Sequence, residues 1–388
     1  MFKTDSKVFE ERREIFFKKL NGKAAIIPSS SLVNHHADCE YPFRQDSNFW
    51  YLTGFDEPDS IALFLPHKPK GERFILFVAP KDILSEVWHG FRWGIEGAER
   101  EFKADKAHSI NDFEGLLPFY IGDSQEIVYS IGKHGKIEKI VLEIFSKQLD
   151  ACSRDGIGAN SIKSPEIYLN EMRLIKSAFE INRMREATQI SAEAHELVRE
   201  SISSKKNERQ IQGLIEGFFL EKGARGPAYN SIVASGDNAC ILHYTSNNSD
   251  LNNGDLLLVD AGCSLIDYYN GDITRTIPIG GKFSKEQKLL YEIVLEAQKT
   301  AIENSVKGSN SSNVHNVALR ILVEGLKEIG LLSGDTDGII ENGSYKHLYM
   351  HRTGHWLGLD VHDVGAYRIG EYDVPLENGM ILTVEPGI

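Results

Sequence analysis

VDAGCSLIDYYNGDITRT, residues 259–276, is the stretch that decides the fold of the second half of this 388-residue chain. An apolar run, residues 256–259, leads into Asp260, and a polar loop leads on to Asp272 at the start of a β-branched run. This pattern predicts a hairpin that brings the two carboxylates together. Asp260 then lies at the edge of a buried sheet, where a metal ion would offset the cost of desolvating its charge.

The aspartate hairpin predicts a cation site only in combination with other ligands. Two adjacent carboxylates repel, and one takes up a proton unless a cation lies between them, but each aspartate taken alone would more often be a turn residue. Oxygen ligands with an imidazole suit manganese, cobalt, zinc or iron. Such groups follow in HRTGHWLGLDVHDVG (residues 351–365) and GMILTVEPGI (residues 379–388), and the candidates are His351, His355, His362 and Glu385.

Two further features support a site around His355. Gly354 and Gly358 flank this histidine and allow the backbone to approach it closely. His243, in the segment ILHYT, precedes the Asp260 strand by one loop. A single one of these histidines would more often have a structural role, so the hypothesis of a reactive centre depends on the whole set.

The first 165 residues alternate strand-like and helical segments, which predicts an α/β domain. Short apolar or β-branched runs that end at Pro or Gly predict strands at residues 23–27, 49–53, 61–66, 74–80 and 126–131. A helix is expected at residues 136–149. A patch rich in Gly, Asn, Ser and Pro at residues 158–165 predicts the boundary between a domain of residues 1–165 and a domain of residues 166–388.

The second domain combines helices with a mainly antiparallel sheet, an α+β arrangement. Ser177 with Glu180, and Ser284 with Gln287, form the pattern of a capping box and predict two helix starts. Further helices are expected at residues 208–222 and 313–329. Strands are expected at residues 231–234, 256–260, 272–278 and 380–385.

The overall composition excludes some classes of partner. A net charge of -13 and a pI near 5.5 argue against nucleic-acid binding, which needs a basic surface. No segment approaches the roughly 20 apolar residues of a membrane span. Residues 1–17 are charged, so we expect an amphipathic helix rather than a secretory signal there. The four cysteines form no C-x-x-C pair, which indicates the reducing cytoplasm.

Several motifs in order resemble aminopeptidase P, the Xaa-Pro aminopeptidase of the pita-bread metallopeptidases. The resemblance covers nearly the whole chain: EYPFRQDSNFWYLTGFDEP (residues 40–58), GPAYNSIVASGDNACILHYT (residues 226–245), the aspartate hairpin, HWLGLDVHDVG (residues 355–365) and TVEPG (residues 383–387). It implies an α/β N-terminal aminopeptidase P domain in residues 1–165 and an α+β pita-bread catalytic domain in residues 166–388.

The resemblance also implies roles for individual residues. Asp260, Asp272, His355 and Glu385 are similar to four of the five metal ligands of the family. The two histidines similar to the catalytic ones, which assist proton transfer and bind the tetrahedral intermediate, are His243 and His362. The residues similar to the lining of the proline pocket are His351 and Tyr229. Trp88 resembles a tryptophan that reaches a neighbouring subunit's site in tetrameric members.

The implied reaction is hydrolysis of the peptide bond between an N-terminal residue and a following proline. In this family a hydroxide held by two divalent metal ions, with manganese as the expected metal, attacks the scissile carbonyl. The expected substrates are peptides with proline at the second position. We expect a cytoplasmic enzyme that forms a homo-oligomer, a dimer or a tetramer, with neither nucleic acid nor membrane as a partner.

The chain departs from the family pattern at two places. The loop from Asp260 to Asp272 is one residue longer, which leaves the ligands unaffected if the extra residue lies at the hairpin tip and shifts the register if it lies in a strand. The family's fifth ligand is a glutamate on the strand after TVEPG, and this sequence ends at Ile388. We therefore expect a fragment that binds at most one metal ion tightly and has little peptidase activity.

Two alternatives remain open. A prolidase, which cuts Xaa-Pro dipeptides, would share the ligands, although HWLG with Trp356 is more similar to aminopeptidase P. A non-catalytic pita-bread binding module, as in some histone chaperones, is compatible with the acidic charge. Such modules typically lose the metal ligands, whereas four of them are present here.

Overall fold

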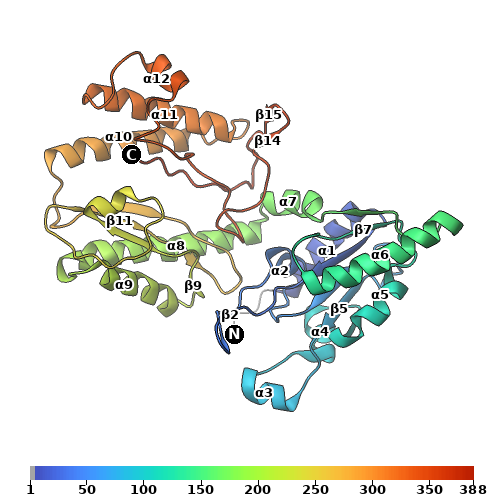
Figure 1. The fold of residues 1–388 in the computed structure, drawn as a ribbon. Coiled ribbons are helices and arrows are strands. Elements are labelled where there is room, and N and C mark those ends of the chain that lie inside the picture. Colours follow the sequence, from blue (N-terminus) through green and yellow to red (C-terminus); the bar gives the residue numbers. More distant parts are fainter. Residues whose placement is uncertain (1–4) are drawn as a thin grey trace. The chain divides into compact units, whose positions relative to one another are not determined.

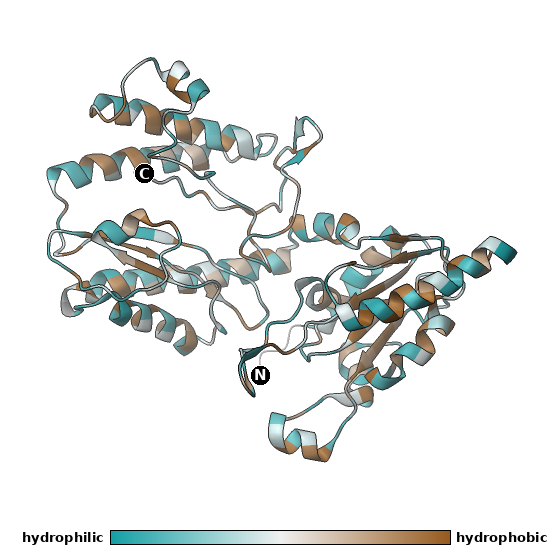
Figure 2. Ribbon diagram, in the orientation of Figure 1, coloured by the Kyte–Doolittle hydropathy of each residue, from teal (hydrophilic) through white to brown (hydrophobic). Residues whose placement is uncertain are grey.

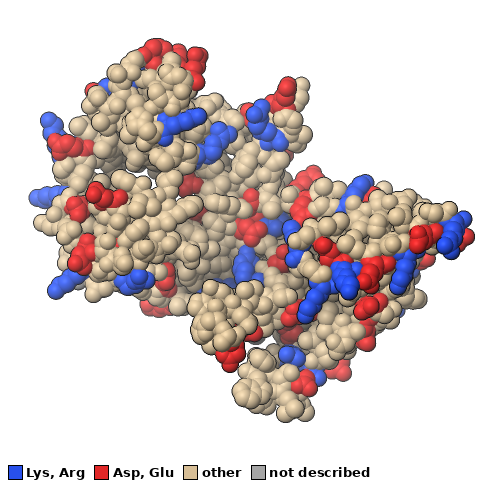
Figure 3. All heavy atoms as spheres, in the orientation of Figure 1, with Lys and Arg blue, Asp and Glu red and all other residues tan. Residues whose placement is uncertain are grey.

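The computed structural model describes residues 5–388, which divide between Asn170 and Glu171 into two compact units (Figure 1). The predicted N-terminal helix is present as α1 (Ser6–Leu20), and residues 1–4 lie outside the described residues. Within the described residues, no helix is both long enough and apolar enough to cross a membrane. On the face shown in Figure 3, acidic and basic side chains are interspersed.

The N-terminal unit is built around one mixed sheet. β1 pairs antiparallel with β4 and parallel with β7, while β5 pairs antiparallel with β4 and parallel with β6. The strands in spatial order are β6 (Lys106–Ser109), β5 (Phe74–Val78), β4 (Ile61–Phe64), β1 (Ala24–Pro28), β7 (Glu126–Val128) and β8 (Ser161–Lys163). The central strands are fully buried and hydrophobic along their length, as expected for a sheet covered on both faces (Figure 2).

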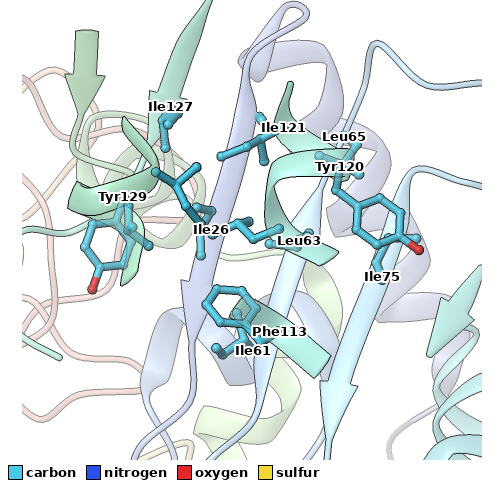
Figure 4. Packing of buried hydrophobic residues seen from close by; sticks show 14 of the residues in the cluster. Ile26, Ile61, Leu63, Leu65, Ile75, Phe113, Tyr120, Ile121, Ile127 and Tyr129 are labelled. Atoms are coloured by element: carbon cyan, nitrogen blue, oxygen red, sulfur yellow. The ribbon is translucent and has the colours of Figure 1, made fainter. Parts of the chain in front are cut away.

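Helices pack against this sheet and complete its core. They are α2 (Ser47–Thr53), α4 (Gly94–Phe102), α5 (Phe113–Ile121) and α6 (Gly135–Asp155), while α3 (Ile83–His89) has no buried residue. Figure 4 shows Phe113 and Ile121 of α5 directed toward Ile26 and Leu63 of the sheet. Outside the core, β2 (Asn34–His36) and β3 (Cys39–Glu40) form a short exposed hairpin. The α/β class expected for this part of the chain is therefore confirmed.

The expected strand at residues 49–53 is wrong, because this segment is helix α2. The Asp46 carboxylate accepts hydrogen bonds from the N–H groups of Asn48 and Phe49 and so caps the helix start. Gly54, with φ of 65°, ends the helix in the left-handed conformation. A short buried apolar run fits a strand and a buried helix equally well, and the aspartate cap was the signal that separates them.

The second unit contains the helices α8 (Ala178–Ser201), α9 (Glu208–Glu221), α10 (Lys285–Glu303), α11 (Ser311–Glu328) and α12 (Thr336–Asn342), and α7 (Glu166–Leu174) spans the boundary between the units. Both expected capping boxes are present, at Ser177 with Glu180 and at Ser284 with Gln287. α10 and α11 pack against each other and enclose an apolar core that includes Leu319, Leu322 and Trp356.

The second unit's sheet is antiparallel, in the order β10 (Ile232–Ser235), β11 (Leu256–Asp260) and β13 (Thr274–Pro278). Its register runs without a shift from the pair Asp260–Thr274 to the pair Leu256–Pro278. The connection folds back at residues 265–269, after the short pairing of β12 (Cys263–Ser264) with β9 (Gly226–Pro227). The register shift considered for the longer loop is therefore not found in this sheet.

Two strand boundaries near the candidate ligands differ from expectation. β13 begins two residues after Asp272 instead of at it. Residues 380–385 were expected to form a strand, but they form one isolated bridge, between Leu382 and Trp356. The N–H groups of Thr383 and Glu385 donate to the carbonyls of His355 and Thr353, so this extended segment is paired along one edge only.

Candidate metal centre

Backbone pairing brings the candidate ligands together from three distant segments. Asp260 ends β11, and Asp272 lies two residues before the antiparallel partner strand β13. His355 is fixed beside the segment of Glu385 because its carbonyl accepts from Thr383 N–H at 2.9 Å. Thr383 Oγ1 also donates to Glu385 Oε1 at 2.8 Å. The sheet and the paired segment thus hold ligand candidates that are up to 125 residues apart in sequence.

Glycines permit this close approach, as the sequence predicted. A Cβ added at Gly354 would lie 1.9 Å from the Thr383 carbonyl oxygen. A Cβ added at Gly358 would lie 2.1 Å from Asp363 Oδ2. Contacts this short are impossible for any other residue, so the segment around His355 can pack here only with glycine at both positions.

Tyr229 joins the two aspartates. Its hydroxyl lies 2.6 Å from Asp260 Oδ1 and 2.8 Å from Asp272 Oδ1. Burial, together with the two negative charges, raises the pKa of Tyr229 well above its usual value, so the phenol remains protonated and donates. The role of Tyr229 in lining the proline pocket stays a prediction, and its hydroxyl is directed at the two carboxylates.

His355 is oriented as a metal ligand would be. Its Nδ1 lies 3.0 Å from the Trp356 carbonyl oxygen, and this contact favours a proton on Nδ1. Nε2 then faces Asp272 Oδ2 at 3.2 Å and Glu385 Oε1 at 3.1 Å. Burial lowers the pKa of His355, but the hydrogen bonds to Asp272 and Glu385 outweigh it and raise this pKa to about 10.

The electrostatics of the site favour a cation. Burial and the charges of Asp272 and Glu385 raise the pKa of Asp260 to about 7, against the opposing hydrogen bond from Tyr229. The buried carboxylates therefore compete for protons, and a divalent ion would remove this repulsion. Three carboxylates and an imidazole match the ligand preference of such ions. Hydrogen bonds set the present spacing, and among residues 5–388 no group of three or more His, Cys, Asp or Glu side chains is positioned to hold a metal ion without rearrangement.

The other three predicted histidines differ in their relation to this cluster. The exposed His362 ring packs edge-on against His355, with 4.2 Å between centroids. His351 is half-buried and its ring packs on Tyr349 with 5.1 Å between ring centroids. Its Nδ1 is hydrogen-bonded to the carbonyl oxygen of Arg352. His243 is exposed on the loop after β10, and the interactions described here do not join it to the cluster.

A buried ion network supports the loop between His355 and His362, and sequence reasoning missed it. Asp363 accepts from Arg173 at 2.6 Å and from Lys176 at 2.9 Å, and all three side chains are almost fully buried. Asn270 of the aspartate hairpin donates from its amide to the carbonyls of Gly358 and Leu359. Because the partners of Asp363 lie about 190 residues earlier, no local pattern pointed to the pairing.

Trp88 belongs to the N-terminal unit and is 83% exposed on α3. α3 has no buried residue within its seven positions, and Ile83, Leu84 and Val87 are also exposed. Figure 2 shows hydrophobic positions on this helix. These four exposed side chains form an apolar patch on α3.

Comparison with known protein families decides the membership of the chain. The model for metallopeptidase family M24 matches residues 182–388, and the model for the aminopeptidase P N-terminal domain matches residues 9–129. The chain belongs to the aminopeptidase P group of metallopeptidase family M24. The expected architecture, an α/β N-terminal domain followed by a pita-bread catalytic domain, is thereby confirmed.

Relatives with the same domain order match the chain along its whole length. The Xaa-Pro aminopeptidase of Haemophilus influenzae is 43% identical over 389 residues, which cover 100% of this chain and 87% of the relative. The Xaa-Pro aminopeptidase of Escherichia coli is 37% identical over 98% of this chain and 86% of its own length.

Solved structures agree with this relationship. The aminopeptidase PepP of Pseudomonas aeruginosa superposes with a TM-score of 0.94 at 38% identity, covering 100% of this chain and 87% of that one. Zinc-substituted aminopeptidase P of E. coli in complex with product has a TM-score of 0.93 at 36% identity. The match covers 99% of this chain and 87% of that one.

Proposed function

We propose that this protein is a Xaa-Pro aminopeptidase, which removes the N-terminal residue from peptides that have proline at the second position. The observation that carries the proposal is the cluster of three carboxylates around His355, in a chain that relatives named Xaa-Pro aminopeptidase match from end to end. Asp260, Asp272, His355 and Glu385 would hold divalent metal ions. These ions would activate the attacking water and polarise the scissile carbonyl.

The remaining residues would handle protons and substrate. When the Xaa-Pro bond breaks, the leaving proline nitrogen must receive a proton, as the leaving nitrogen of any peptide bond does. We assign this transfer to His243, and stabilisation of the negative intermediate to His362, whose ring contacts His355. His351 would line the pocket for the proline ring. Tyr229 would also line the pocket for the proline ring, while its hydroxyl holds Asp260 and Asp272 close together.

The metal is proposed to be manganese. The ligand set of carboxylates and one imidazole accepts several divalent ions, and the name of the E. coli structure records that zinc can replace the metal in that protein. Loading with manganese, zinc, cobalt or iron, followed by peptidase assay, tests the identity. Elemental analysis by mass spectrometry counts the tightly held ions per chain, and the absence of any ion would argue against the proposed metal centre.

We further propose a cytoplasmic homo-oligomer, a dimer or a tetramer, that uses α3. The exposed Leu84, Val87 and Trp88 would gain burial in a subunit contact, and tryptophan is a frequent anchor of such contacts. Light scattering on the intact protein, with Trp88→Ser beside Phe119→Ser as a control at another exposed aromatic, tests the contact. An unchanged mass in Trp88→Ser would argue against this surface.

Substrate length separates the proposed activity from its enzymatic alternative. An aminopeptidase P cleaves Xaa-Pro-Yaa, whereas a prolidase prefers the dipeptide Xaa-Pro. We expect faster hydrolysis of the tripeptide, and its loss in His243→Ala with His347→Ala, an exposed histidine of the same unit, as the matched control. Hydrolysis of the dipeptide alone would favour prolidase, and failure to cleave either peptide with each metal would favour a non-catalytic module.

A further inference from the structure

Glu208 is a buried carboxylate that receives an unusual number of hydrogen bonds. It is the first residue of α9, and its exposed fraction is 0%. Oε1 accepts from Ser235 N–H at 2.7 Å, Ser235 Oγ at 2.8 Å and Asn238 Nδ2 at 3.1 Å. Oε2 accepts from the Tyr244 hydroxyl at 2.8 Å and from Ser249 N–H at 2.9 Å.

These bonds keep Glu208 ionised. Burial by itself would raise its pKa, but hydrogen bonds from Ser249, Ser235 and Asn238 outweigh burial and hold the pKa below its usual value. A buried carboxylate is stable only when its lone pairs are satisfied, and here both oxygens are. Glu208 is therefore an anion that is held in place by its hydrogen-bond donors. The donors in turn need Glu208 as their acceptor.

The donors enclose the loop that carries His243. Ser235 and Asn238 precede this histidine, and Tyr244 and Ser249 follow it. The next residue of α9, Arg209, also binds this loop, because its guanidinium donates to the Ser246 carbonyl at 2.6 Å. The loop is therefore held by hydrogen bonds to the start of α9, in addition to the small apolar cluster that Tyr244 forms with Ile232 and Ala234.

A second anchor fixes the same loop beside the aspartate strand. Asn247 is fully buried and has φ of 46°, a backbone conformation that is uncommon outside glycine. Its Oδ1 accepts from Val233 N–H at 2.9 Å, and its Nδ2 donates to the Ser231 carbonyl at 2.8 Å. Between these residues lies Ile232, the β-sheet partner of Asp260. The loop is thus tied to the strand that presents a candidate ligand.

We propose that Glu208 is the positioning residue for His243: through Tyr244 and Ser249 it holds the His243 loop against α9 and beside the Asp260 strand. This inference rests on the proposed function for the part played by His243 in proton transfer. It goes beyond that function because the hydrogen-bond partners of Glu208 given above include none of the candidate metal ligands.

Glu208→Gln tests the proposal with almost no change in volume. The amide presents an NH₂ group to donors, so a buried backbone N–H such as that of Ser249 loses its acceptor. Hydrogen exchange of residues 241–250, measured by mass spectrometry on the full chain, is expected to become at least about tenfold faster. Glu221→Gln, the same change at an exposed position of α9, is expected to leave this exchange unchanged.

Two further measurements separate positioning of His243 from general support. Modification of His243 by diethylpyrocarbonate should change in rate in Glu208→Gln, while modification of exposed His347 should not. On Xaa-Pro-Yaa, Glu208→Gln should lower kcat more than it changes KM, and it should add no further loss in the His243→Ala background. If His243→Ala alone leaves activity intact, the proposed role of His243 fails, while the exchange experiment still decides the positioning of the loop.

A milder variant covers the case in which Glu208→Gln does not fold. Tyr244→Phe removes one of the five hydrogen bonds to Glu208, together with the contact between the hydroxyl and Asn238. It should speed exchange of residues 241–250, whereas Tyr372→Phe at an exposed site should not. Unchanged exchange of residues 241–250 in a folded variant would overturn the proposal. An equal increase throughout residues 171–388 would also overturn it, because it would indicate a purely structural role.

Discussion

We predict that the protein loses stability in mild acid because His315 is buried. A substitution at this position should abolish that part of the loss. The histidine lies on α11 in the apolar core of the second unit, with an exposed fraction of 8%. Its Nδ1 lies 2.9 Å from Thr353 Oγ1, which also bonds to the Tyr349 hydroxyl at 2.6 Å. Burial, with smaller contributions from the charges of Arg352 and His351, lowers the pKa of His315 to about 4.

The sign and size of the effect follow from proton linkage. The unfolded chain, with a histidine pKa near 6.5, binds a proton before the folded chain does as the pH falls. The stabilisation is therefore complete above about pH 6.5 and is lost as the pH falls toward about 4. Between pH 7 and pH 4.5 the loss of unfolding free energy due to His315 is at most about 2 kcal/mol. Allowance for solvent screening reduces it to about 1 kcal/mol.

His315→Gln keeps a hydrogen-bonding side chain but cannot titrate. Native-state hydrogen exchange of α11, followed by mass spectrometry as urea is added, measures the free energy of opening in this unit separately from the N-terminal one. We expect the metal-free protein to lose about 1–2 kcal/mol more than His315→Gln between the two pH values. Exposed His347→Gln is the matched control and should behave as the unsubstituted protein does. Equal losses in His315→Gln and the unsubstituted protein would refute the reasoning.

Three more substitutions test other parts of the site. Asp363→Asn removes the carboxylate partner of buried Lys176 and leaves Arg173 paired with Asp360. It should cost about 3–5 kcal/mol in unfolding free energy, whereas Asp337→Asn at an exposed pair should cost less than about 1 kcal/mol, both measured by urea denaturation. Gly354→Ala should prevent normal packing and lower the thermal midpoint sharply, whereas Gly338→Ala, where a Cβ meets only ordinary contacts, should not. Tyr229→Phe removes the hydroxyl between the aspartates and should weaken metal affinity about 10–100-fold in calorimetric titration, and unchanged affinity would contradict its supporting role.

Sequence reasoning succeeded where the signal is local. The capping boxes at Ser177 and Ser284 predicted two helix starts correctly, because a cap is formed by residues three positions apart. The strand ending at Asp260 was also predicted correctly, since an apolar run followed by polar turn residues specifies both its type and its end. The same locality explains why glycines at 354 and 358 could be interpreted before the structure was known.

Errors arose where tertiary contacts override a weak local pattern. Residues 49–53 form a helix because Asp46 caps it, although the apolar run alone also fits a strand. Residues 380–385 have the pattern of a strand, but pairing along one edge leaves only the bridge at Leu382. The contact of the Tyr229 hydroxyl with two aspartates, which the resemblance did not indicate, became visible only in three dimensions.

The sequence by itself determined the family, the class of chemistry and the identity of the ligand candidates, because these depend on residue types in short motifs. Tertiary structure alone decided which groups meet. It placed Tyr229 between Asp260 and Asp272, and it surrounded Glu208 with donors from a loop up to 41 residues away. The physical reason is that hydrogen bonds and ion pairs between distant segments depend on chain path and burial, which no local pattern records.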